Sequence, residues 1–225
     1  MLTIEAHEFF DEVKTGNLEK VKELIDKDPA LLHAKNKSGA TGILFALYNN
    51  HPEVAELIAQ RKHDLDVFEA SGLGKLAQLE ALIKRNPGLV RTYSEEGFTA
   101  LQLAAYLGQE ETVDILLKDG ALVNAVAKNP TGYTALSGAV SRGHRNIAGR
   151  LLAKGANSNH TYEGGFTPLM EAAASGNLEI TRLLLAHGAD PQIKMGGKTA
   201  HDYALEKGHE EAAALLKEHK TDVRP

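Results

Sequence analysis

The feature that most constrains this chain is a segment that recurs four times in its second half. Each copy begins with glycine and has threonine two positions later, and the first glycines are spaced by 35, 33 and 32 residues. They are Gly97, Gly132, Gly165 and Gly197. A second glycine follows each first one after eleven residues, and a leucine pair comes next. Self-similarity at this period is typical of a repeat array, in which each unit buries its apolar side only against its neighbours.

Each marker of the repeat has a structural reason. The threonines suit helix N-caps, where the hydroxyl accepts hydrogen bonds from backbone amides of the first turn. The second glycine allows a left-handed residue between two helices. Apolar residues at spacings of three and four, such as Val113, Leu116 and Leu117, predict a second amphipathic helix. Each copy is therefore expected to be a helix-turn-helix unit.

The motif resembles the ankyrin repeat. The family's Thr-Pro-Leu-His-x-Ala-Ala stretch is similar to the segment from Thr167 to Ala173, and its Gly-Ala-Asp ending stands at Gly188 to Asp190. The resemblance implies an all-α solenoid of about seven helix-turn-helix repeats with short β-hairpins, here called fingers, between them. We expect one domain over residues 1–225. Its approximate repeats are 4–36, 37–65, 66–95, 96–130, 131–163, 164–195 and 196–225.

The N-terminal half is more divergent, but the spacing of its markers supports the same repeat. Gly16, Pro29, Gly39 and Thr41 recur 58 residues later as glycine, proline, glycine and threonine. Asn50 takes the turn position that glycine holds elsewhere, and the next turn glycine follows after only 24 residues instead of about 33. The sequence therefore predicts seven helix pairs, with a missing finger near residues 61–66 and a weak junction there.

The amino-acid composition excludes or disfavours several classes of function. The chain has no cysteine, which excludes disulfides, thiol nucleophiles and Cys-ligated metal. Its 10 histidines show no metal-binding spacing, and no complete nucleotide-binding motif occurs, so neither a metal nor a cofactor is expected. A net charge of −5 disfavours nucleic acid as a partner. No signal peptide or membrane-spanning stretch is evident, so we expect a monomer in the cytoplasm.

The resemblance implies that finger tips and inner helices bind a partner. Three consecutive fingers carry an aromatic residue at one equivalent position, and aromatics and arginine often anchor interfaces. The same aromatics could instead only pack on the neighbouring turn. The candidate partner-binding residues are Glu95, Glu96, Phe98, Tyr106, Tyr133, Arg142, Tyr162, Phe166, Lys194 and Met195.

The function expected from the resemblance is a non-catalytic protein–protein interaction module, such as a scaffold, that binds an as yet unidentified protein. One alternative is a groove that binds a small molecule or peptide. An enzyme is a third possibility, but no catalytic constellation stands out in the sequence, so no catalytic residue is predicted.

Overall fold

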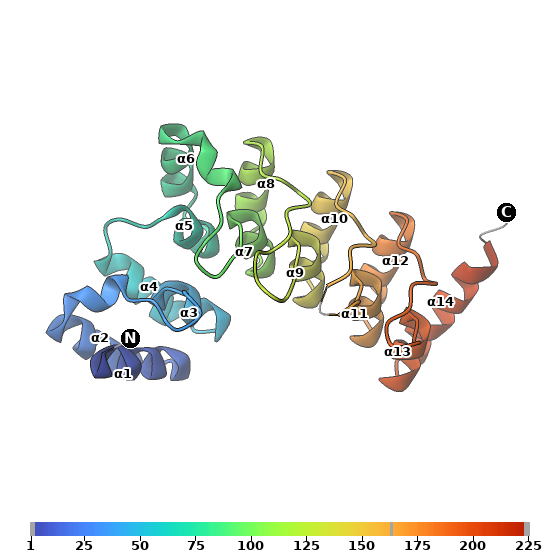
Figure 1. Cartoon of the computed structure of the whole chain (residues 1–225), viewed down its shortest axis with the longest axis horizontal. Coiled ribbons are helices and arrows are strands. Elements are labelled where there is room, and N and C mark those ends of the chain that lie inside the picture. Colours follow the sequence, from blue (N-terminus) through green and yellow to red (C-terminus); the bar gives the residue numbers. More distant parts are fainter. Residues whose placement is uncertain (1–2, 163, 223–225) are drawn as a thin grey trace. The chain divides into compact units, whose positions relative to one another are not determined.

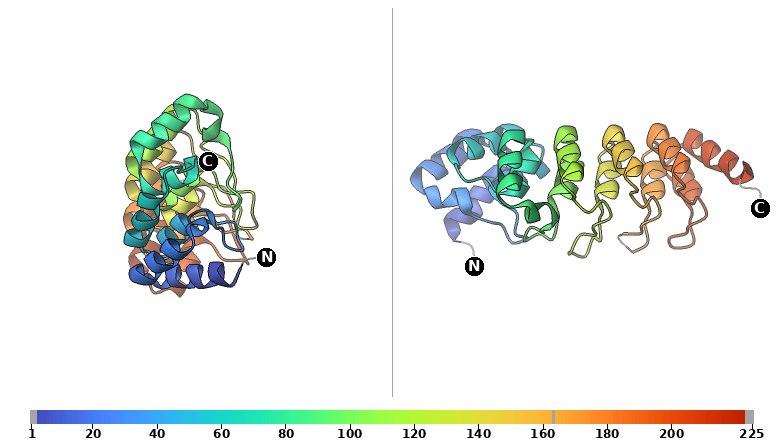
Figure 2. Two further views of the ribbon diagram at one scale, coloured as in Figure 1. Left: turned by 90° about the vertical axis from the view of Figure 1, so that its left-hand side faces the viewer. Right: turned by 90° about the horizontal axis from the view of Figure 1, so that it is seen from above.

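The computed structural model describes residues 3–162 and 164–222, and the side chains up to residue 219. The chain falls into two compact units, Met1–Gly120 and Ala121–Pro225. The single-domain interpretation of the sequence stays a prediction. Figures 1 and 2 show the helices of each unit arranged in pairs, with the loops between pairs projecting from one side of the helix layers.

The N-terminal unit contains four helix pairs. Inner helices α1, α3, α5 and α7 pack in sequence, α2 packs on α4, and α6 packs on α8. The helices are α1 (Ile4–Thr15), α2 (Leu18–Lys27), α3 (Gly42–Tyr48), α4 (Pro52–Arg61), α5 (Val67–Leu73), α6 (Leu76–Arg85), α7 (Ala100–Tyr106) and α8 (Glu110–Lys118). Two short 3₁₀ helices, η1 (Pro29–His33) and η2 (Pro87–Arg91), follow α2 and α6.

The C-terminal unit contains three more pairs. Inner helices α9, α11 and α13 pack in sequence, as do outer helices α10, α12 and α14. The helices are α9 (Ala135–Ser141), α10 (Arg145–Ala153), α11 (Pro168–Ala174), α12 (Leu178–Ala186), α13 (Ala200–Glu206) and α14 (Glu210–Asp222). Fully buried leucines, such as Leu136, Leu151 and Leu169, fill the space between the helices of this unit.

The predicted threonine caps are confirmed. Thr41, Thr99, Thr134, Thr167 and Thr199 each accept a hydrogen bond from the backbone N–H three residues later. All five threonines are buried, so this bond satisfies an amide that water could not reach. The repeat's threonine therefore fixes where each of these inner helices begins.

The turn between the helices of a pair is left-handed. Gly16, Gly74 and Gly143 have φ values of +76°, +68° and +74°, and Asn50 adopts the same conformation with φ +62°. Asn50 is the one non-glycine residue with positive φ among the residues that the structure describes. The prediction that Asn50 holds the turn position of the second repeat is therefore confirmed.

The predicted fold class is confirmed as an all-α repeat array with seven helix pairs over the described residues. The fingers are short. Each of four fingers has a single antiparallel bridge, such as Lys35 with Thr41 and Tyr93 with Thr99. None of the helices that the structure describes is long and apolar enough to cross a bilayer.

The finger is missing between α4 and α5, where residues 62–66, here called the seam, are the whole connection. The next such connection runs from residue 86 to residue 99. Lys62 Nζ lies 2.9 Å from both carboxylate oxygens of Glu69, and these side chains are 7% and 0% exposed. Glu69 also accepts a hydrogen bond from the backbone N–H of Asp66, completing a capping box at the start of α5. A buried ion pair therefore spans the seam, and the weakness expected at this junction stays a prediction.

Candidate partner-binding surface

Four of the candidate residues lie in the N-terminal unit, on the finger of residues 93–99 and on α7. With one finger missing, this finger meets the finger of residues 35–41 directly. Lys35 forms an ion pair with Glu95, and a Cβ atom on Gly39 would lie only 2.8 Å from the Cβ of Glu95. Glu95 is therefore already engaged within the chain.

Glu96 and Tyr106 are engaged in the same way, through Tyr48 at the end of α3. The Tyr48 hydroxyl donates a hydrogen bond of 3.0 Å to Glu96 Oε2. The rings of Tyr48 and Tyr106 pack edge to face, with centroids 6.1 Å apart. Phe98 is partly exposed. Through Tyr48 the second repeat thus contacts the fourth repeat across the gap left by the missing finger.

Burial at this contact shifts the pKa values of Glu96 and Tyr48. Removal from water raises the pKa of Glu96, and the hydrogen bond from Tyr48 opposes that shift. Burial also raises the pKa of Tyr48 well above its usual value, and the nearby Glu96 charge adds to the increase. Tyr48 therefore stays a hydrogen-bond donor at neutral pH, which suits a structural contact.

The C-terminal unit carries a row of aromatic rings, here called the aromatic row. It consists of Tyr133, Tyr162, Phe166 and Tyr203. Tyr133 and Tyr162 lie 4.9 Å apart between ring centroids, Tyr162 and Phe166 6.2 Å, and Phe166 and Tyr203 5.1 Å. All three contacts have interplanar angles near 70°, an edge-to-face geometry that rings favour.

The members of the aromatic row differ in exposure. Tyr162 is only 3% exposed and lies beneath its neighbours, whereas Tyr133, Phe166 and Tyr203 are partly exposed. Tyr162 can therefore support the row but offers little area to a partner in this conformation. The other three rings are the members of the row that can offer surface to a partner, two on the fingers and one on α13.

Tyr203, on the inner helix α13, is not among the residues that the sequence singled out. In the last repeat the finger position is Lys198, which bonds Glu206 and places its Nζ atom 5.9 Å from the centre of the Tyr203 ring. The ring of Tyr203 thus takes over from the finger aromatic that this repeat lacks. The sequence feature that could have identified Tyr203 is the presence of a tyrosine in the repeat whose finger position carries Lys198.

The other candidates of this unit are Arg142, Lys194 and Met195. Arg142 is exposed after the end of α9, and Lys194 is exposed on the last finger. Met195 is half-buried, and its carbonyl accepts a hydrogen bond of 3.3 Å from the Tyr203 hydroxyl. Its side chain lies against the preceding finger, where a Cβ on Gly165 would be 3.6 Å from Met195 Cγ.

The carboxylates with shifted pKa values in this unit belong to caps and ion pairs. Hydrogen bonds from the backbone and hydroxyl of Thr199 lower the pKa of Asp202 to about 2. Lys198 lowers the pKa of Glu206. Within the part of the chain that the structure describes, no three His, Asp or Glu side chains come together as a metal site would require. The chemistry that this surface offers is apolar and aromatic contact bordered by charges.

Known proteins share this repeat. A family model described as ankyrin repeats in three copies matches residues 67–162 and 150–225, beginning at the first residue of α5. The human BCL-6 corepressor-like protein 1 is 38% identical over 130 residues, which cover 57% of this chain and 7% of that protein. A Caenorhabditis elegans homologue of transient receptor potential cation channel subfamily A member 1 is 34% identical over 182 residues, covering 76% of this chain and 15% of that protein.

A viral relative is matched over a larger share of its own length than the two relatives above. The putative ankyrin repeat protein FPV031 of Fowlpox virus (strain NVSL) is 33% identical over 130 residues, which cover 55% of this chain and 38% of that protein. The chain thus spans less than two fifths of the length of each of these three relatives.

Proposed function

Because the chain belongs to the ankyrin repeat family, whose repeats generally mediate protein–protein interaction, we propose that it binds a partner protein through its fingers and inner helices. It does so without catalysis, as a monomer in the cytoplasm, and its partner is a protein and not a nucleic acid. The observation that carries this proposal is the aromatic row. Partly exposed aromatic rings on a well-packed support are the residues that most often anchor interfaces.

The aromatic row also narrows the binding surface. Tyr133 and Phe166 are partly exposed, and each ring packs on Tyr162. Such rings are held in position before a partner arrives, so little side-chain entropy is lost on binding. We place the main contact on the C-terminal unit, with Arg142 and Lys194 at its border. Glu95, Glu96 and Tyr106 contribute less, because their contacts with Lys35 and Tyr48 already occupy them.

The test is affinity purification of the tagged chain, with mass spectrometry of the proteins that are recovered with it. The variant carries Phe98→Ala, Tyr133→Ala and Phe166→Ala together. If two of the three rings are anchors, binding of the recovered partner should weaken by at least about 100-fold. Substitution of Lys154, Glu179 and Arg182 by alanine is the matched control, because these exposed residues lie on or just after the outer helices α10 and α12.

The stability of the triple variant must be measured alongside binding. Each edge-to-face contact is worth about 0.5–1.5 kcal/mol, so the melting temperature should fall while the chain stays folded. A second variant, Arg142→Glu with Lys194→Glu, changes the border and leaves the rings intact. Normal binding by both folded variants would place the partner on another face. Unfolding of the triple variant with normal binding by the border variant would show that the aromatics only pack.

A further inference from the structure

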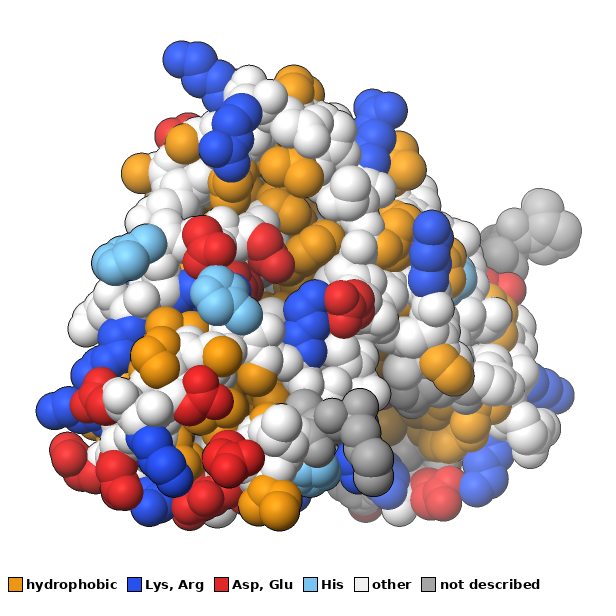
Figure 3. Space-filling model, turned by 60° about the vertical axis from the view of Figure 1, so that its left-hand side comes forward, with side chains coloured by type: hydrophobic (Ala, Val, Ile, Leu, Met, Phe, Trp, Pro, Cys, Tyr) orange, Lys and Arg blue, Asp and Glu red, His pale blue; other side chains and the backbone are white. Residues whose placement is uncertain are grey.

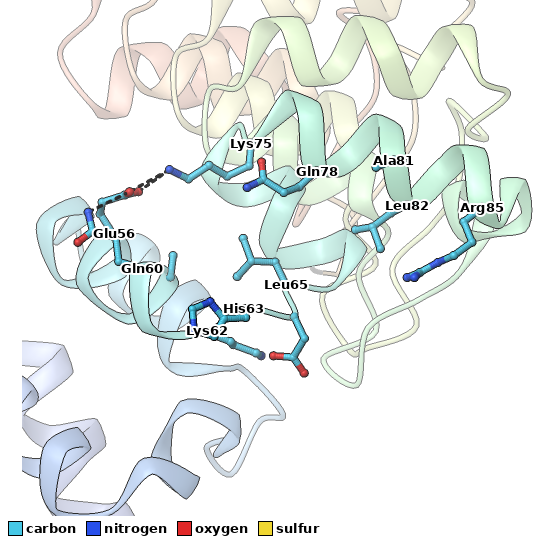
Figure 4. Close-up of a pocket in the computed structure, with 12 residues that line it drawn as sticks. Glu56, Gln60, Lys62, His63, Leu65, Lys75, Gln78, Ala81, Leu82 and Arg85 are labelled. Carbon is cyan, nitrogen blue, oxygen red and sulfur yellow. Dashed lines mark hydrogen bonds and ion pairs between the residues drawn. The ribbon is translucent and has the colours of Figure 1, made fainter.

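The missing finger leaves a cavity of about 580 Å³ on the outer side of the N-terminal unit. Its walls are α4 and α6, and the seam closes its lower side (Figure 4). This volume lies in the usual range for ligand sites. The fingers and the inner helices contribute nothing to its lining, so the cavity is separate from the surface proposed above.

The cavity has an apolar floor and polar ends. Leu65 of the seam and Leu82 of α6 approach the middle from opposite sides (Figure 4). At one end, Lys75 Nζ lies 2.8 Å from Glu56 Oε2, and this hydrogen-bonded lysine lowers the pKa of Glu56. At the other end, Arg85 reaches from the last turn of α6 towards Leu82. Figure 3 shows a face of the molecule on which apolar side chains lie next to acidic and basic ones.

Most of the charges that line the cavity are paired. The ammonium group of Lys62 is held by Glu69, and that of Lys75 by Glu56. Asp64 lies 3.9 Å from His33 Nε2. Among the described residues, Arg85 is the cation of this lining that has no carboxylate within bonding distance. A guanidinium next to an apolar floor favours a carboxylate ligand that also carries an apolar group.

Two amide side chains suggest that the ligand is a peptide. Gln60 on α4 and Gln78 on α6 line the cavity from its two walls, and both are exposed. Gln60 Nε2 donates a bond of 3.3 Å to Glu56 Oε1, which leaves the Gln60 carbonyl oxygen as an acceptor for a ligand. An amide side chain can donate and accept at once, which matches the N–H and C=O groups of an extended backbone. An extended segment lying between the two helices would therefore meet hydrogen-bonding groups on both sides and apolar side chains beneath.

We propose that this cavity is a second binding site, which takes an extended peptide segment of a partner protein. An aliphatic side chain of the peptide packs on Leu65 and Leu82, and an Asp or Glu beside it pairs with Arg85. The buried pair of Lys62 and Glu69 keeps the seam, and with it Leu65, in the position that forms the floor.

The test begins with a random heptapeptide library displayed on phage and panned against the full chain. Enriched sequences should share an Asp or Glu within two positions of Leu, Ile, Val or Met. A labelled synthetic peptide of that sequence is then titrated by fluorescence anisotropy. Arg85→Glu should weaken its binding at least about tenfold, the loss expected for one charge-assisted hydrogen bond. Leu82→Ala should weaken it as well.

The controls separate this site from the fingers. Lys84→Glu makes the same charge change at the exposed neighbour of Arg85, outside the cavity, and should leave binding unchanged. Phe166→Ala should also leave it unchanged, whereas loss of binding in that variant alone would assign the peptide to the aromatic row. Melting temperatures show that each variant is folded.

Three results would overturn the proposal: no enriched sequence, equal binding to wild type and Arg85→Glu, or full competition by N-acetyl-glutamate amide. Full competition would show that the site binds a small anion and does not recognise a peptide.

Discussion

The buried ion pair of the seam allows a quantitative prediction. Lys62→Met removes the cation and keeps a side chain of similar length. Glu69, which is 0% exposed, would then retain only the hydrogen bond from the Asp66 N–H and would lose two contacts of 2.9 Å to Lys62. Removing one partner of a buried pair costs about 3–5 kcal/mol, because the remaining charge is buried without compensation. The junction between α4 and α5 should open more easily by that amount.

The assay is hydrogen exchange with mass spectrometry on the full chain, following peptides that cover residues 52–73. A local loss of 3 kcal/mol corresponds to more than about 100-fold faster exchange, since each 1.4 kcal/mol is a factor of ten. Lys62→Met combined with Glu69→Gln should recover at least half of the loss. The neutral Gln oxygen can still accept the bond from the Asp66 N–H.

Lys75→Met is the matched control. It breaks the neighbouring pair with Glu56, whose side chains are 31% and 42% exposed, and exposed pairs contribute about 1 kcal/mol or less. If Lys62→Met changes exchange no more than Lys75→Met does, the buried pair does not hold the seam and our reasoning fails.

Three further predictions concern stability. Asn50→Ala should lower the free energy of unfolding by about 1 kcal/mol, because φ +62° suits alanine poorly, while Asn50→Gly should be neutral or slightly stabilising in urea titrations; a neutral alanine would contradict this. Leu151→Ala, at a fully buried position, should cost about 2–5 kcal/mol in the same titrations, and a loss below 1 kcal/mol would show that the core closes around the gap. Asp202 has a pKa of about 2 in the folded chain, below its unfolded value, so its contribution is complete above about pH 4 and disappears as the pH falls towards 2. Asp202→Asn should flatten that part of the stability–pH curve, and an unchanged curve would refute the assignment.

Local features of the fold could be predicted from the sequence because single residues determine them. A buried threonine at the N-cap and a left-handed residue at the turn each leave a recognisable residue type, and Thr134 and Gly143 lie where the repeat predicts. The shortened interval after Asn50 likewise predicted the missing finger. The number of residues between two markers limits which structural elements can form between them.

The contacts across the gap could not be predicted in this way. Nothing local in Lys35 or Tyr48 indicates that they meet Glu95 and Glu96, 60 and 48 residues away, because the pairing depends on how the helix pairs turn where a finger is absent. The pair of Lys62 and Glu69 was missed for a different reason. Charged residues usually lie in water, so nothing in the sequence around the seam indicates a buried ion pair. The binding role of the ten candidate residues stays a prediction.

The missing finger also affects how contacts can be transferred from related arrays. In the N-terminal unit the finger of residues 35–41 has the finger of residues 93–99 as its next neighbour, although two complete helix pairs lie between them in the chain. A partner that touches successive fingers would therefore pass from the loop before the second helix pair to the loop before the fourth. If two arrays are aligned by repeat number, the finger of residues 35–41 is assigned the wrong neighbouring finger. Contacts from related arrays should therefore be transferred finger by finger.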